Sequence, residues 1–381
     1  MSWECKTVEE KREEFVVSAE SSCNFSALCR EYAITRKTGY KWLKRHAEGL
    51  PMSDADRAPL HIANKTPHET ERLILDLRAD NPGWGARTIH RVLTNQGYAS
   101  LPCVKTVNNI LSRNGCIDPV ESQKRTPIQR FAREHSNDMW QTDFKGEFRM
   151  NNGNYCYPLD IIDDCTRFAI RVIPFESTAN VVIPSFQAAF REFGMPNSVL
   201  SDNGAQFAGF RHGIGQFEKF LMNLDILPIH GRIKHPQTQG KIERFHRTMK
   251  DELLRFRTFD NLDDADDALQ EWRRKYNNVR PHEALNMLCP AEVYVRSGRE
   301  YPEKIEPYEY GSEYRVIKVN SWGYVRFAHY QVYISETMID ELIGFRHSDD
   351  GNAFIACYRN FKIAEFDTST GKLISRHISR L

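Results

Sequence analysis

Three acidic residues stand in settings that could do chemistry together: Asp143 in MWQTDFKGEF, Asp202 in VLSDNGAQF and Glu243 in HPQTQGKIERFHRTMK. Asp143 and Asp202 each follow a short apolar run that favours a strand, and Glu243 lies in a basic run that favours a helix. Because Mg²⁺ prefers oxygen ligands and keeps several waters, three such carboxylates suffice to hold two ions (Mg²⁺ or Mn²⁺). A pair of these ions clamps the attacking and leaving oxygens of a phosphodiester during in-line displacement. The pattern therefore predicts metal-dependent phosphodiester chemistry.

Helical spacing places cations beside the third acid. Residues at i, i+3, i+4 and i+7 share a helix face, so Glu243, His246, Arg247 and Lys250 should align. An acid among bases on a helix is ordinarily a surface ion-pair array of little energetic consequence. Beside two further acids, it fits a metal ligand flanked by side chains that bind phosphate. From this stretch we expect DNA contacts by Lys241, Arg244, Arg247 and Lys250.

Four segments occur in a fixed order: WQTDF, SDNGAQF, HPQTQGKIERFHR with Lys250 downstream, and YNNVRPHEAL. As an ordered set they resemble the integrase-type DDE transposases of bacterial insertion sequences, over roughly residues 134–295. The resemblance implies a ribonuclease-H-like catalytic core of the retroviral-integrase type, with Asp143, Asp202 and Glu243 as its catalytic acids. It also implies double-stranded DNA as the partner, both terminal repeats and target, and self-association into a dimer or larger synaptic complex.

The chain departs from the family pattern at two places. Forty residues separate Asp202 from Glu243, more than is usual, which indicates a small insertion around GFRHGIGQF. Gln239 stands where the family often has Asn, so the role of that side chain is open.

Other family segments are expected to be structural. The acids of LDIIDDCTR (Asp160, Asp163 and Asp164) should serve a strand and its turn, with Arg167 pairing to one of the last two. The motif from Tyr276 to His282 could contact DNA or a subunit, but a packed corner is the preferred interpretation.

Length and composition favour a multidomain intracellular protein. A chain of 381 residues exceeds one hydrophobic core, and 40% hydrophobic with 27% charged residues is ordinary for globular proteins. No apolar run approaches the roughly 20 residues of a membrane span, and the charged N-terminus lacks the apolar region of a secretion signal. Nine scattered cysteines without a C-x-x-C pair argue for reduced thiols and against structural zinc. We expect a bacterial cytoplasmic location, associated with the nucleoid, and no membrane partner.

The net charge of +1 conceals basic clusters. Residues 30–45 contain six basic residues against one acid, and residues 232–257 contain eight against three. Clustered cations are the electrostatic footprint of a nucleic-acid partner, whatever the total charge.

The N-terminus predicts a helix-turn-helix domain over residues 1–50. Three short helices fit residues 7–47, with Asn24 and Thr35 as N-caps of the second and third. The third would be the recognition helix, and the alternative is a solvated basic helix on an ordinary bundle. Its candidate DNA contacts are Arg36, Lys37, Tyr40, Lys41, Lys44 and Arg45. Residues 51–66 should be a linker.

A second helix-turn-helix domain is predicted over residues 67–117. Helices fit residues 68–82, 83–97 and 103–115, with Gly97 and Gly115 as C-terminal stops and Trp84 in the core. Candidate phosphate contacts are Arg87, Arg91 and Lys105. Residues 118–133 should be a basic linker, with Lys124 and Arg125, that lies along DNA or is only a tether.

The remaining pattern predicts an α/β core and a small all-β domain. Residues 134–300 alternate between strands and helices as a mixed sheet requires: WQTDFKGEF, YCYPLDIID, RFAIRVIPF, SVLSDNG and ILPIHG as strands, with helices at 180–194, near 238–256 and at 262–278. Residues 301–381 show period-two runs such as GYVRFAHYQVYI, typical of a small barrel or sandwich.

The sequence thus predicts a transposase that exposes a 3′-hydroxyl at its element ends and joins it to target DNA. Two alternatives remain open: a catalytically silent DNA-binding regulator, and a metal-dependent nuclease without strand transfer.

Overall fold

The computed structural model describes residues 7–54, 65–117, 133–209, 213–231, 240–327, 329–348 and 351–381. The chain divides into two compact units, Met1–Lys65 and Thr66–Leu381. Most of the predicted basic linker, including Lys124 and Arg125, lies outside the described residues.

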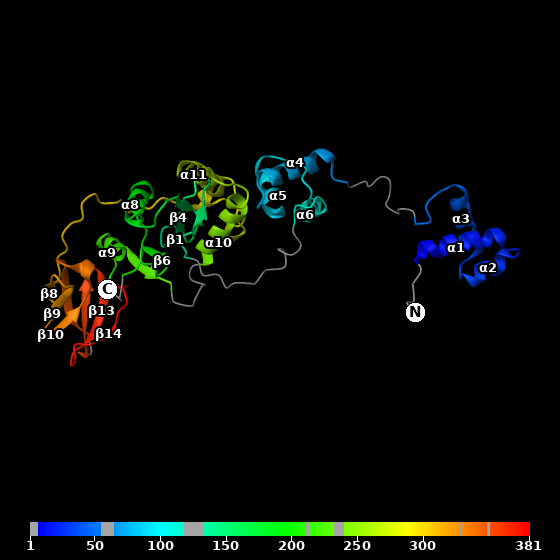
Figure 1. The fold of residues 1–381 in the computed structure, drawn as a ribbon. Coiled ribbons are helices and arrows are strands. Elements are labelled where there is room, and N and C mark those ends of the chain that lie inside the picture. The colour runs from blue at the N-terminus through cyan, green and yellow to red at the C-terminus, as the bar shows by residue number, and fades with distance from the viewer. Residues whose placement is uncertain are drawn as a thin grey trace. The chain divides into compact units, whose positions relative to one another are not determined.

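The first unit is a three-helix domain whose predicted caps are confirmed. Its helices are α1 (Val8–Ser21), α2 (Phe25–Glu31) and α3 (Arg36–Ala47) (Figure 1). The Asn24 side chain accepts the N–H of Ala27, and the Thr35 side chain accepts the N–H of Thr38. Phe15 and Trp42 are buried in its core. The basic side chains of α3 are therefore presented from a packed scaffold.

The second predicted set of helices opens the second unit. It comprises α4 (His68–Asp80), α5 (Ala86–Asn95) and α6 (Val104–Arg113). Gly97 and Gly115 follow α5 and α6 with φ of 90° and 70°, the left-handed conformation that ends a helix. Trp84 is 2% exposed, which confirms it as a core residue.

A five-stranded mixed sheet forms the centre of the second unit, as predicted. Its strands are β1 (Trp140–Phe144), β4 (Leu159–Asp163), β5 (Ala169–Ile173), β6 (Ser198–Ser201) and β7 (Leu227–His230). The order is β5-β4-β1-β6-β7, with β1, β4 and β5 antiparallel and β1, β6 and β7 parallel. This is the strand order and polarity of the ribonuclease-H-like sheet.

Helices cover both faces of this sheet, because successive strand residues point to opposite sides. The flanking helices are α8 (Val182–Phe193), α9 (Gln216–Asn223), α10 (Gly240–Met249), α11 (Leu262–Asn278) and the short α12 (Pro290–Val293). Ile161 packs into the cluster with Phe186 and Phe190 of α8, whereas its neighbour Ile162 packs with Phe245 of α10 and Trp272 of α11. The core therefore has three layers, with α10 on the side opposite α8.

The sequence prediction missed three features of the core. WQTDFKGEF and YCYPLDIID are each broken, because β2 (Phe148–Arg149) and β3 (Tyr155–Cys156) form a separate two-stranded ribbon. Helix α9 begins within the last residues of the inferred insertion and was not predicted. The predicted helix near 238–256 continues beyond α10 as a π-helix, Lys250–Leu254.

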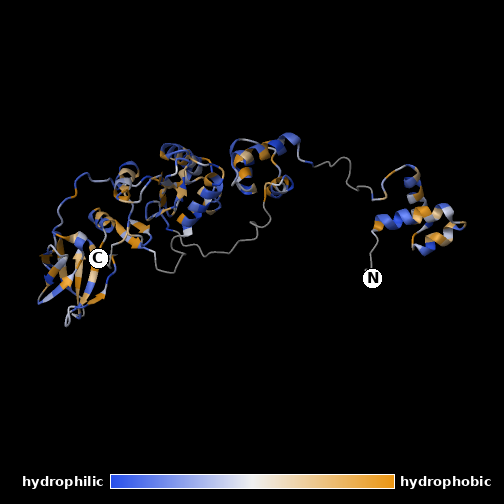
Figure 2. Cartoon of the chain, in the orientation of Figure 1, coloured by the Kyte–Doolittle hydropathy of each residue, from blue (hydrophilic) through white to orange (hydrophobic). Residues whose placement is uncertain are grey.

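The C-terminal region is all-β, as predicted. Its strands are β8 (Arg315–Lys318), β9 (Tyr324–Phe327), β10 (Tyr330–Tyr333), β11 (Leu342–His347), β12 (Ala353–Tyr358), β13 (Phe361–Asp367), β14 (Leu373–Ser375) and β15 (Ser379–Arg380). Apolar residues of these strands meet in one core, and the hydrophobic stretches are visible along the strands in Figure 2. The run GYVRFAHYQVYI is a hairpin of β9 and β10, not one strand.

This β region docks on the α/β core. Ile214 and Met222 of the core join the hydrophobic cluster of the β region. Lys219 of α9 pairs with Glu341 at 2.7 Å, and Arg380 pairs with Asp225 at 2.8 Å. Within the described residues, no helix is long and apolar enough to cross a membrane.

Candidate active site

The two predicted strand-end aspartates meet at one edge of the sheet. Asp143 lies on β1, directly opposite Asp160 of the antiparallel β4. Strand β6 runs parallel to β1, so Asp202, which follows β6, reaches the same edge. Burial raises the pKa of Asp143 to about 6; the nearby His246 opposes the rise, and the charges of Asp202 and Asp160 add to it. The electrostatic coupling of these carboxylates is what a shared cation site requires.

The conformation of Asp202 is fixed by a tight turn. Its Oδ1 accepts the N–H of Gly204 at 2.9 Å. A Cβ at Gly204 would come within 2.9 Å of that oxygen, so a larger residue would displace the carboxylate. The Asn203 amide donates to the carbonyl of Gly231 at 2.9 Å and ties the turn to the end of β7. Asp202 is thus a turn former and a site residue together.

Two residues behind Asp202, the half-buried His230 and the buried Glu218, were not predicted. His230 Nδ1 lies 3.1 Å from the backbone carbonyl of Asp202, and its Nε2 lies 2.9 Å from Glu218 Oε1. Burial acts to lower the pKa of His230, but the hydrogen bond and charge of Glu218 prevail and the pKa is raised. A protonated His230 donates from both nitrogens, and so holds the backbone at Asp202. Because Glu218 lies on the unpredicted α9, no local sequence signal pointed to this pair.

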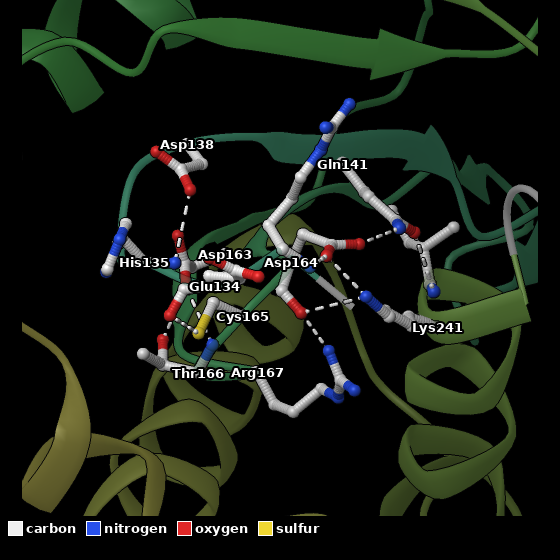
Figure 3. Close-up of polar contacts among 12 residues, drawn as sticks. Glu134, His135, Asp138, Gln141, Asp163, Asp164, Cys165, Thr166, Arg167 and Lys241 are labelled. Atoms are coloured by element: carbon white, nitrogen blue, oxygen red, sulfur yellow. Dashed lines mark hydrogen bonds and ion pairs between the residues drawn. The ribbon is translucent and has the colours of Figure 1, made fainter. Parts of the chain in front are cut away.

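The third acid is carried by a helix whose first turn is anchored to the sheet. Glu243 itself is exposed on α10. Just before it, the ammonium of Lys241 pairs with the buried carboxylate of Asp164 (Figure 3). Gln141 of β1 donates to Asp164 Oδ1 at 2.6 Å and accepts the N–H of Ile242 at 3.3 Å. These contacts fix the start of α10 beside the edge that carries Asp143.

A second contact anchors α10 one turn further along. His246 Nε2 lies 2.9 Å from Asp160 Oδ2, and His246 Nδ1 lies 3.9 Å from Asp143 Oδ2. The sequence prediction placed His246 on the face of Glu243 but assigned it no partner. This contact depends on the cross-strand register that sets Asp160 opposite Asp143, which the sequence alone does not reveal.

The other acids of LDIIDDCTR are structural, as predicted. Asp163 accepts hydrogen bonds from the backbone and hydroxyl of Thr166 and from the backbone of Asn137, at 2.7–2.8 Å. Arg167 donates to the backbone carbonyl of Asp164. The predicted pairing of Arg167 has the right partner but the wrong acceptor, since the carbonyl and not the carboxylate receives its hydrogen bond.

The last motif packs as a corner of the core. Tyr276 is 4% exposed. The centroid of its ring lies 4.9 Å from that of Phe245 and 4.7 Å from that of His282. The Asn277 side chain bonds both backbone groups of Ala169, at 2.8 and 3.0 Å. These contacts support the packing interpretation over direct DNA contact.

Comparisons with known proteins agree with this geometry. An integrase core domain family matches residues 133–236, and a second integrase core domain family matches residues 224–290. The chain is similar to the insertion element IS407 uncharacterized 31.7 kDa protein of Burkholderia multivorans, with 25% identity over 63% of this chain and 87% of that protein. It is also similar to the transposase InsD for insertion element IS2A/D/F/H/I/K of Escherichia coli, with 26% identity over 56% of this chain and 74% of that protein. Residues 133–290 are therefore similar to integrase cores, and the matches support an integrase-type DDE transposase of an insertion sequence.

The comparison with solved structures also finds an integrase catalytic core domain. The magnesium complex of the HTLV-2 integrase catalytic core domain covers 42% of this chain and 99% of its own, with 17% identity and a TM-score of 0.33.

The predicted DNA-contact residues differ in how they are presented. Exposed in the first unit are Arg36, Lys37, Tyr40, Lys41 and Lys44, whereas Arg45 is half-buried and donates to the carbonyl of Pro51. In the second unit Arg87, Lys105, Arg244, Arg247 and Lys250 are exposed, and Arg91 is half-buried. Lys241 is half-buried, and its ammonium pairs with the buried carboxylate of Asp164. A phosphate contact by Lys241 would require that buried pair to break.

The acids fit a divalent cation in their chemistry. All three are oxygen donors of the kind that Mg²⁺ prefers. The raised pKa of Asp143 reflects buried negative charge that a cation would offset. Across the described ranges, however, no group of three or more His, Cys, Asp or Glu side chains is arranged to hold a metal ion. Asp143 and Asp202 lie close enough to interact electrostatically, but Glu243 does not join them as a third metal ligand in this structure.

Proposed function

We propose that the chain is a DNA transposase that binds its element ends, hydrolyses a phosphodiester to expose a 3′-hydroxyl, and joins that hydroxyl to target DNA. The observation that carries the proposal is the meeting of Asp143 and Asp202 at one sheet edge, with α10 anchored beside them. The integrase core match and the similarity to a transposase give coarser support, because they point to DNA transposition or integration.

Asp143, Asp202 and Glu243 would hold two Mg²⁺ or Mn²⁺ ions. When bound, such ions activate the attacking oxygen and stabilise the leaving one. The chain itself supplies the carboxylate oxygens, the Gly204 turn that orients Asp202, and the anchored helix that carries Glu243. No protein nucleophile is needed in this scheme.

Double-stranded DNA is the proposed partner throughout. The exposed cations of α3 would recognise the terminal repeats, and Arg244, Arg247 and Lys250 of the catalytic helix would hold phosphates near the site. Joining two ends to one target requires at least two catalytic sites, so we propose a dimer or larger synaptic assembly. Its place of action would be the bacterial nucleoid.

The test is a divalent-metal assay with labelled DNA ends. The full chain, with Mg²⁺ or Mn²⁺, should release a nicked end and then give joined products, and chelation should stop both steps. Cleavage without joining would make the protein a nuclease. Binding to the ends without any reaction would make it a regulator, and either result contradicts the proposed transposase activity.

A further inference from the structure

A fourth carboxylate lies behind the predicted triad. Asp160 is 0% exposed and stands directly across from Asp143 in the β1–β4 register. Neither of its carboxylate oxygens has a well-aligned hydrogen bond among the described residues, although His246 Nε2 approaches one of them to 2.9 Å. Asp160 is therefore a buried acid with His246 as its close polar neighbour.

Its position is costly if it serves packing alone. Taking a carboxylate out of water costs several kcal/mol after relaxation, and the cost is offset only by excellent pairing. The residues on either side of Asp160, Leu159 and Ile161, are apolar and fully buried. An apolar side chain at position 160 would suit the same strand at lower cost.

His246 connects this buried acid to the site. Its ring comes from α10, with Nε2 facing Asp160 and Nδ1 facing Asp143 at 3.9 Å. Glu243 lies one helical turn before His246 on the same face. The ring thus links β1, β4 and α10, the elements that carry the first acid, the buried acid and the third acid.

We propose that Asp160 is a positioning residue: through His246 it orients the Asp143 carboxylate and sets the spacing between β1 and the helix that carries Glu243. The inference rests on the proposed function, since it assumes that Asp143 and Glu243 hold divalent cations. Residues that orient metal-binding side chains typically change metal affinity by about 10–100-fold when they are mutated.

The experiment compares Asp160→Asn and Asp160→Leu with wild type in the full chain. Mn²⁺ affinity is measured from free Mn²⁺ by electron paramagnetic resonance, and stability from a thermal melt without metal. Asp160→Asn keeps an oxygen opposite His246, so its Mn²⁺ affinity should fall less than that of Asp160→Leu. The leucine variant should bind Mn²⁺ about 10–100-fold more weakly while its melting temperature holds or rises, because a buried carboxylate has been removed.

A matched control is Asp163→Asn on the same strand. Asp163 is equally buried, but Thr166 and Asn137 satisfy its oxygens. This variant should melt at a lower temperature and keep wild-type Mn²⁺ affinity. A purely structural Asp160 would behave in the same way, with stability and not affinity changing.

The outcomes separate this inference from the proposed function. If wild type binds Mn²⁺, Asp143→Asn abolishes that binding, and both Asp160 variants bind like wild type, the positioning role is overturned and the proposed function stands. If wild type binds no Mn²⁺ and joins no DNA, both fail. A leucine variant that does not fold leaves the asparagine variant to decide, since unchanged affinity there is also contrary to the proposal.

Discussion

Two pairs of acids on neighbouring strand ends have opposite hydrogen-bonding environments. Asp163 and Asp164 are surrounded by donors: Asp163 accepts three hydrogen bonds, and Asp164 accepts from Gln141 and from the backbone of Arg133 and pairs with Lys241. Asp143 and Asp160 face each other across β1 and β4 with the ring of His246 between them. The first pair is stabilised by the fold, whereas the second leaves negative charge partly uncompensated.

This difference distinguishes the acids that anchor the fold from those that we propose serve the site, whereas burial does not. Asp160, Asp163 and Asp164 are all 2% exposed or less. Buried polar groups are normally hydrogen-bonded, and an exception calls for an explanation such as strain, catalysis or a missing ion. The donors around Asp164 explain how the start of α10 is held. In our proposal a cation acts beside Asp143, opposite the unsatisfied Asp160.

The largest expected effect is on the chemistry of the triad. Asp143→Asn, Asp202→Asn and Glu243→Gln should each abolish cleavage and joining, because an amide keeps the size of the side chain and loses the charge that offsets the cations. DNA binding should persist, since the exposed cations are untouched. Strand-transfer assays and gel shifts measure the two properties, and robust joining by any one variant would remove that residue from the site.

The second prediction concerns the ion pair between Lys241 and Asp164. Lys241→Met leaves the Asp164 carboxylate buried without its cation, and breaking such a pair costs about 3–5 kcal/mol. The melting temperature should therefore fall by roughly 4–8 °C for a unit of this size. The double variant with Asp164→Asn should lose less than the sum of the single changes, because both remove one interaction. Strict additivity would show that the ion pair contributes nothing to stability.

The third prediction is that removing the charge of Asp143 stabilises the protein, whereas breaking the Lys241–Asp164 pair destabilises it. Its pKa is raised to about 6 in the folded protein, so the folded state binds more protons than the unfolded state between about pH 4 and pH 6. Stability from this group is present at low pH and is lost as pH rises through 6. Asp143→Asn should therefore raise the stability of the metal-free protein at pH 8, by at most about 3 kcal/mol, with the advantage vanishing below about pH 4.

Thermal melts across this pH range measure the effect. Added Mg²⁺ should raise the melting temperature of wild type at pH 8 and leave Asp143→Asn unchanged. A variant less stable than wild type at pH 8 would show that Asp143 is held by donors, like Asp163.

The sequence predicted the positions of those acids that are marked by their immediate neighbours in the chain. Apolar runs before Asp143 and Asp202 predicted strand ends, and parallel pairing of β1 and β6 was enough to bring them to one edge. The helix with Glu243 followed from its cations and spacing. The environment of Asp160 could not be predicted, because it depends on the register between β1 and β4 and on a ring from α10.

The missed elements have similar causes. The run GYVRFAHYQVYI carries no Gly, Pro or Asn at the point where β9 pairs back on β10, so no turn signal divided it. Helix α9 bears on the site through Glu218, which contacts His230 at the end of β7. Such contacts are long-range in sequence, and only the folded chain brings them together.

The smallest predicted effect is at Lys250, which contacts DNA in our proposal but binds no metal. It is exposed at the first residue of the π-helix that extends α10. Removing a charge-assisted phosphate contact costs roughly 1.5–3 kcal/mol, so Lys250→Ala should slow joining by about one to two orders of magnitude. Metal dependence and the thermal melt should not change, because the acids and their anchors remain.

A matched control for Lys250 is Lys304→Ala, which removes an equally exposed ammonium from the segment between core and β region. It should join at the wild-type rate. Lys250→Arg should recover much of the loss if charge alone matters, and little if the compact ammonium is required. If Lys250→Ala transfers strands at the wild-type rate at saturating metal, Lys250 is only a solvated side chain. The proposed site would then consist of the carboxylates without this cation.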